Sequence, residues 1–171
     1  MNKKFIVFLF ILLLCGCKAE TSFEDIRQHY LNMTQYSGVY KYETDFGGVF
    51  EYVCQYEYTD GNGRLTILSP EEIAGITAIT DSTGDYLEFE DITLTTYLPD
   101  SEEASPVSAI HRLISDIRTR MPSLITETEV LEITFESGDY TKIATLSKED
   151  FAILSCEIFY LGDRILNITL Q

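Results

Sequence analysis

The sequence has 171 residues, of which 28 are acidic and 12 are basic, so its formal net charge at neutral pH is −16. A chain of this length forms a single domain with a substantial hydrophobic core. The acid excess argues against nucleic acid as a partner, because binding a phosphate backbone requires clustered Lys and Arg.

The first segment of the chain has the order of a secretory signal peptide. Two lysines precede an apolar run, Phe5–Leu14, whose ten residues fall well short of the ~20 that a membrane-spanning helix needs. The next stretch, Leu14-Cys15-Gly16-Cys17, resembles the lipobox of bacterial lipoproteins, in which the signal is cleaved before a cysteine that carries a diacylglyceryl group. The resemblance implies that residues 1–16 are a signal peptide and that Cys17 is the lipid attachment site. The alternative is an ordinary signal peptide that is cleaved elsewhere.

Residues 17–21 are then the lipidated N-terminus and a short tether. Two acyl chains such as palmitate attach a protein stably to a bilayer, whereas one chain gives only marginal binding. We therefore expect attachment to the membrane through diacylglyceryl-Cys17, on the outer face of the cytoplasmic membrane. The spacer Lys18–Glu20 spans at most about 13 Å, so the domain is expected close to the lipid headgroups.

An amphipathic helix is predicted directly after this tether. Ser22, with Asp25 three residues later, is typical of a helix N-terminus that is closed by a capping box. Apolar residues then recur at helical spacing at Phe23, Ile26, Tyr30 and Met33. The pattern predicts a helix that runs to about Thr34.

From Tyr36 onward the apolar residues alternate, which predicts antiparallel strands. The alternation is clearest at residues 49–58, where one face is almost entirely aromatic. Turn sequences such as Asp60-Gly61-Asn62-Gly63 separate the segments. The predicted strands are 36–46, 49–58, 64–68, 76–80, 85–90, 92–98, 128–136, 140–146, 153–161 and 164–170.

A second amphipathic helix is predicted between the two groups of strands. Ser105 is its expected N-cap, Pro106 lies in its first turn, and Pro122 ends it. Its apolar face is expected to contain Val107, Ile110, Leu113, Ile114, Ile117 and Met121. The most economical fold is an α+β domain over residues 22–171, a half-open barrel in which a curved antiparallel sheet of nine or ten strands is covered by the two helices.

The sequence shows little catalytic equipment, and we expect no enzyme activity, no cofactor and no metal site. His29 and His111 lie beside the apolar stripes of the predicted helices and are interpreted as surface residues. The sequence contains neither a Cys/His spacing typical of zinc sites nor a Gly-x-Ser-x-Gly nucleophile elbow. Cys54 and Cys156 are interpreted as buried free thiols, and a disulfide between them is the alternative.

The aromatic face of the first two strands is the main candidate for a binding site. In an ordinary sheet these side chains form the core, but a curved sheet under loosely packed helices leaves an apolar groove for acyl chains or for a hydrophobic part of a partner. Tyrosine hydroxyls then line its wet end. The candidate groove residues are Tyr40, Tyr42, Phe50, Tyr52, Tyr56, Ile110 and Ile114.

The order of the elements resembles the LolA/LolB lipoprotein-carrier family over about residues 22–170. The resemblance is carried by the N-terminal helix, the long aromatic strands, the terminal meander and the stretches SPVSAIHRLISDI, LSPEEIAGITA and YLEFEDITL. It implies a LolA-like half-open barrel that binds lipid chains without catalysis. A soluble carrier has no lipid of its own, so Cys17 makes this chain more similar to an anchored receptor.

The chain also resembles the GerS-like germination lipoproteins, which share this type of fold. That resemblance implies a different role, the binding and activation of a cell-wall amidase in spore germination. The sequence therefore predicts a non-enzymatic, membrane-anchored lipoprotein that binds a hydrophobic acyl or lipoprotein ligand at the cell envelope. The alternative is a lipoprotein that regulates a protein partner.

Overall fold

A computed structural model describes residues 21–45, 48–82, 84–90, 92–95 and 105–171 of the chain. The predicted signal peptide, the tether up to residue 20 and Cys17 lie outside the described residues. Within the described residues, no helix has the length and apolar character needed to cross a membrane.

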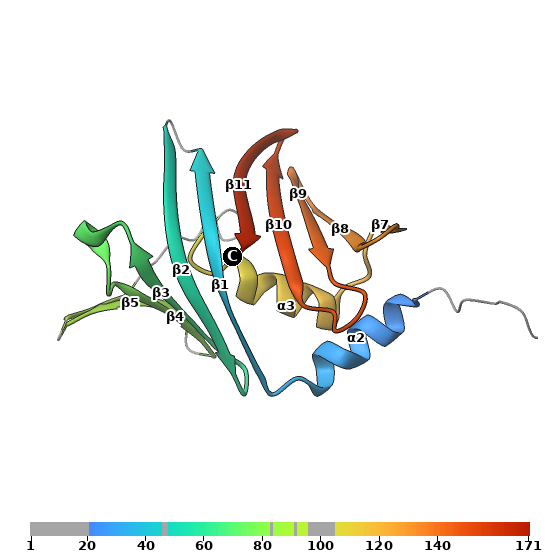
Figure 1. Cartoon of the computed structure of the whole chain (residues 1–171), viewed down its shortest axis with the longest axis horizontal. Coiled ribbons are helices and arrows are strands. Elements are labelled where there is room, and N and C mark those ends of the chain that lie inside the picture. The colour runs from blue at the N-terminus through green and yellow to red at the C-terminus, as the bar shows by residue number, and fades with distance from the viewer. Residues whose placement is uncertain (1–20, 46–47, 83, 91, 96–104) are drawn as a thin grey trace, which may run out of the picture.

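The described part of the chain forms one antiparallel sheet of eleven strands that curves without closing (Figure 1). The strand order is β6-β5-β4-β3-β2-β1-β11-β10-β9-β8-β7, so two meanders meet where the first strand pairs with the last. In that pair Tyr40 is opposite Leu170, and Tyr42 is opposite Ile168. The bounds are β1 Gln35–Asp45, β2 Val49–Thr59, β3 Asn62–Ser69, β4 Thr77–Asp81, β5 Gly84–Phe89, β6 Ile92–Thr95, β7 Leu124–Glu127, β8 Leu131–Ser137, β9 Tyr140–Leu146, β10 Ile153–Tyr160 and β11 Asp163–Leu170.

The predicted α+β fold, a curved and open sheet with two helices, is confirmed. The strand count is higher than the nine or ten predicted because of β7. The sequence pattern predicts one strand over 128–136 and none over 124–127, whereas β7 occupies Leu124–Glu127 and β8 begins at Leu131. All four residues of β7 are exposed at the sheet edge, so burial imposes no alternation on them.

Helix α2 (Phe23–Asn32) begins as predicted. The Ser22 side chain accepts a hydrogen bond from the Asp25 backbone N–H, and the Asp25 carboxylate accepts one from the Ser22 N–H. The two together close a capping box. A 3-10 helix, η1 (Glu71–Ile73), follows β3.

Helix α3 (Ala109–Thr119) is shorter than predicted at both ends. The N-cap is Ser108 instead of Ser105, and its hydroxyl accepts a hydrogen bond from Arg112 Nε at 3.0 Å. The C-terminal end lies before Met121, which is exposed instead of joining the apolar face. The residue that precedes a proline is driven away from helical geometry, and Met121 precedes Pro122.

Both helices lie on the same, concave side of the sheet (Figure 1). The core fills the space between them and β1, β2 and β8 to β11. Cys54 and Cys156 are buried there as free thiols, as predicted. They lie on β2 and β10 with two strands between them, which at about 4.8 Å per strand spacing is roughly 14 Å, too far for a disulfide.

Candidate functional site

The concave face passes from buried to exposed along a single row of side chains. Strand pairing aligns Tyr56, Leu65, Ala78, Leu87 and Leu94 across β2 to β6. The first three are buried, Leu87 is half-buried, and Leu94 is 60% exposed. Among the described residues, the helices therefore cover the middle of the concave face and leave its β5–β6 end uncovered.

The N-terminal turn of α3 forms the boundary of the covered region. His111 Nδ1 lies 3.3 Å from the Tyr56 hydroxyl, and its ring packs against Tyr58. Gly63 permits this approach, because a Cβ at that position would lie only 2.6 Å from His111 Nδ1. The Arg112 guanidinium lies 3.7 Å from the Asp85 carboxylate on β5.

His111 is half-buried, so its interpretation as a surface residue holds only in part. Burial lowers the pKa of its imidazole, although the nearby Asp85 carboxylate opposes this shift. The helical pattern alone did not show that the glycine of β3 leaves room for the ring. His29 is exposed, as predicted, and packs against the rings of Tyr30 and Phe151.

Beyond α3, the concave face carries a set of apolar side chains, which we call the apolar strip. It consists of Ile67, Leu87, Phe89, Ile92 and Leu94. Phe89 is 42% exposed, and its partner Ile92 is 59% exposed. Strand β6 reads Ile-Thr-Leu-Thr and carries no charged side chain. Contiguous exposed apolar surface of this kind marks interaction sites more often than isolated apolar residues do.

The seven predicted groove residues fall into two groups. Tyr40, Tyr42, Tyr56, Ile110 and Ile114 are fully or almost fully buried between the sheet and α3. Phe50 is exposed and Tyr52 is half-buried, because the β1–β2 hairpin extends past the helices. Of the candidate set, these two are accessible from solvent as the chain is folded here.

The buried tyrosine hydroxyls differ in their partners. Tyr40 donates a hydrogen bond to the Ile153 carbonyl at 3.1 Å and contacts the Tyr36 hydroxyl, which in turn accepts one from the Ile153 N–H. The Tyr42 hydroxyl is buried and has no hydrogen-bond partner among the described residues. Burial raises the pKa of both Tyr40 and Tyr42, so both hydroxyls are neutral at physiological pH.

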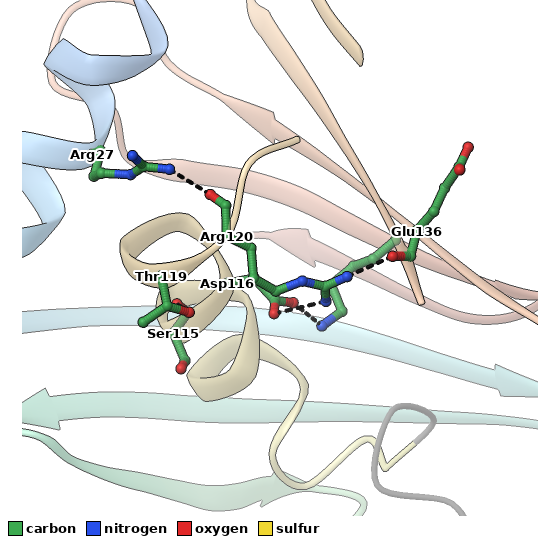
Figure 2. A network of polar contacts seen from close by, with 7 residues as sticks. Arg27, Ser115, Asp116, Thr119, Arg120 and Glu136 are labelled. Carbon is green, nitrogen blue, oxygen red and sulfur yellow. Dashed lines mark hydrogen bonds and ion pairs between the residues drawn. The ribbon is translucent and has the colours of Figure 1, made fainter. Parts of the chain in front are cut away.

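A buried charge cluster fixes α3 to the sheet, and the sequence reasoning missed it (Figure 2). Lys142 Nζ lies 2.5 Å from Asp116 Oδ2, and Arg120 Nη1 lies 3.0 Å from Asp116 Oδ1. Arg120 also donates to the Glu136 carbonyl at 2.5 Å. The sequence does contain a signal for this cluster. Lys142 has the same alternation phase as Ala144, so the strand pattern places a lysine on the inward face of β9, where it needs a buried acidic partner.

The described residues contain no group of three or more His, Cys, Asp or Glu side chains that is arranged to hold a metal ion. A hollow of about 660 Å³ lies where β1 and β3 begin and β2 ends, next to β4. It is lined by residues of both faces of the sheet, among them Ser37, Glu57 and Arg64 of the outer face and Tyr36 and Tyr58 of the inner face. None of its lining residues belongs to the apolar strip.

No protein-family model matches the chain, and no curated protein matches it in sequence. Several solved structures are similar to it. An uncharacterized conserved protein from Thermus thermophilus is 9% identical, with a TM-score of 0.50 over 86% of this chain and 82% of that one. A chain from the complex of the CwlD amidase with the GerS lipoprotein from Clostridioides difficile is 14% identical, with a TM-score of 0.50 over 90% and 96%.

A LolA superfamily protein from Nitrosomonas europaea, NE2245, is 11% identical, with a TM-score of 0.41 over 85% of this chain and 75% of that one. The two structures with a TM-score of 0.50 share the overall fold of this chain. At these identities the likeness to the solved structures concerns the fold alone, so any statement about ligands must come from the residues of this chain. In this fold the accessible apolar surface lies at the β5–β6 end of the concave face.

Proposed function

We propose that this protein is a non-enzymatic lipoprotein that binds a hydrophobic chain, such as an acyl chain, on the concave face of its sheet. The observation that carries the proposal is the apolar strip, an uncovered continuation of the hydrophobic core. An acyl chain laid along Leu87, Phe89 and Leu94 buries apolar surface on both sides, and each buried methylene contributes about 0.8 kcal/mol. Phe50 and Tyr52 add accessible apolar surface on β2. The buried candidates Tyr40, Tyr42 and Tyr56 of the sheet and Ile110 and Ile114 of α3 belong to the filled core.

The proposal includes attachment to the outer face of the cytoplasmic membrane through diacylglyceryl-Cys17. Its support is the order of basic, apolar and small residues before that cysteine. Cys17→Ser removes the acceptor of the lipid, and the variant is expected in the soluble fraction or mis-sorted. Retention of Cys17→Ser in the membrane fraction to the same extent as the unmodified chain would defeat the anchor assignment.

Ligand binding is tested with a soluble chain that begins at residue 18, which retains every described helix and strand. A fluorescent fatty acid serves as the probe, and the chain contains no Trp that would interfere with its excitation. The variant Phe89→Glu/Leu94→Glu places charges in the strip and is expected to weaken binding at least tenfold. The control is Val49→Glu, which replaces an exposed apolar residue of β2 on the convex face of the sheet, opposite to the face that carries the strip. Equal affinity of all three proteins contradicts the proposal.

A second candidate is a lipoprotein that binds and regulates a cell-wall amidase. Two observations favour it. The space between the helices and the centre of the sheet is filled by side chains such as Tyr40 and Ile114, and one solved structure of similar fold comes from a complex of the CwlD amidase with the GerS lipoprotein. Native mass spectrometry after gentle purification separates the candidates. A stoichiometric adduct of acyl-chain mass supports ligand binding, and a bare chain that forms a complex with a purified amidase supports the second.

A further inference from the structure

The first described residues attach to one particular edge of the sheet. The backbone N–H of Thr21 donates to the Glu127 carboxylate at 3.2 Å, two residues before α2 begins. Glu127 is the last residue of β7, and its other oxygen lies 2.8 Å from Lys148 Nζ. The sheet order places β7 at the edge opposite to β6. The chain therefore enters the domain at the β7 edge.

The same edge exposes apolar side chains, which we call the β7 corner: Met121, Leu124 and Ile125. Their exposed fractions are 71%, 57% and 36%. The backbone here is fixed, because Arg27 of α2 donates to the Arg120 carbonyl at 2.6 Å (Figure 2). The same guanidinium lies 3.1 Å from the Met121 sulfur. The corner is thus an apolar surface that is attached to both helices.

The length of the tether limits what this corner can contact. Cys17 precedes Thr21 by four residues, which span at most about 14 Å. If Cys17 carries the lipid, Thr21 and the β7 edge to which it is bonded lie within that distance of the headgroups. Other exposed apolar residues, such as Val49 and Leu161, lie in or next to the turns at the far end of the sheet from α2 (Figure 1).

We propose that the β7 corner lies in the interfacial layer of the membrane, with phospholipid headgroups and the upper acyl region as its partner. This inference rests on the proposed lipid anchor at Cys17. Transfer of apolar side chains from water to this depth is favourable. The anchor holds them there against the electrostatic repulsion between an anionic membrane and the acidic domain. The edge of β7, which pairs with no other described strand, then faces the hydrated headgroups, and the apolar strip at the β6 edge faces away from the membrane.

The test uses the lipidated chain in phosphatidylcholine vesicles that contain a lipid with a spin label on its headgroup. Single variants Met121→Cys and Leu124→Cys receive an environment-sensitive fluorophore, and Val49→Cys and Leu161→Cys serve as controls. The control sites are similarly exposed, at 71% and 67%. The native Cys54 and Cys156 are buried and do not compete for the label.

We expect at least threefold stronger quenching by the spin-labelled lipid at positions 121 and 124 than at 49 and 161. Equal quenching at all four sites, on protein that sediments with the vesicles, overturns the placement of the β7 corner and leaves the anchor intact. Protein that remains in the supernatant overturns the anchor and this placement together. Binding of the fluorescent fatty acid is measured separately, so its loss does not affect either result.

Discussion

The buried ion pair between Asp116 and Lys142 offers a direct test of how helix α3 is held on the sheet. Asp116→Asn keeps the shape of the side chain but removes its charge. The Lys142 ammonium then loses the carboxylate oxygen that lies 2.5 Å away, and Arg120 loses its partner at 3.0 Å. We expect the variant to fold with substantially reduced stability.

The magnitude follows from burial. Asp116 is 8% and Lys142 is 4% exposed, so water does not replace the lost partner. Breaking a buried ion pair from one side costs about 3–5 kcal/mol. For a domain of this size, each kcal/mol lowers Tm by about 2–4 °C, which gives a decrease of roughly 6–20 °C.

The assay is urea or thermal unfolding followed by far-UV circular dichroism, since the chain has no Trp. The control is Glu157→Gln, which breaks a partly exposed pair with Arg164 at 2.7 Å. Such surface pairs contribute at most about 1 kcal/mol. If Asp116→Asn destabilises the protein no more than Glu157→Gln does, the ion pair does not fix α3 and this reasoning is refuted.

Three further predictions follow from other buried groups. Tyr42→Phe removes a buried hydroxyl that has no partner among the described residues, and we expect it to raise the free energy of unfolding by about 1 kcal/mol. Tyr40→Phe breaks the hydrogen bond to the Ile153 carbonyl and is expected to lower that free energy by a similar amount. Urea titrations of the two variants should therefore show changes of opposite sign. Burial lowers the pKa of His111 in the folded state, so the unfolded state binds more protons and stability falls as the pH drops through ~6.5. His111→Gln should show a smaller loss between pH 7 and pH 5, and an identical pH profile would contradict the account. Burial raises the pKa of both native thiols to about 12, so Cys54 and Cys156 should react with a thiol reagent at pH 8 only after unfolding, and fast reaction of the native protein would show that the core opens.

The sequence predicted those elements whose local chemistry is complete within a few residues. Ser22 and Asp25 fix the start of α2 through side-chain bonds to the local backbone, and the structure contains these bonds. The alternation of aromatic and polar residues in β2 predicts which side chains face the core. The buried cysteine thiols followed from the same alternation.

The predictions that failed depend on contacts between distant segments. The start of α3 was placed at Ser105, but Ser108 occupies the N-cap and bonds to Arg112. The burial of His111 requires Gly63, which lies 48 positions earlier in the chain, and no local pattern connects the two. The pairing of Asp116 with Lys142 likewise joins a helix to a strand that follows much later.

The candidate site was predicted only in outline. Strand alternation identified the concave face, but it did not show how far α3 extends over that face. Helix α3 covers the concave face as far as Tyr56 and leaves Leu94, in the same row of side chains across the sheet, exposed. The accessible surface is therefore displaced by several strands from the aromatic strands that dominate the sequence pattern.

The pairing of β1 with β11 has a consequence for the synthesis of this protein. The two meanders, β1 to β6 and β7 to β11, become one sheet only when Leu166, Ile168 and Leu170 take their places beside β1. β11 is synthesised after the other described strands. Until then, one edge of β1 and its tyrosines lack their neighbouring strand. A chain truncated before β11 therefore remains open along its centre and exposes its aromatic core to proteases.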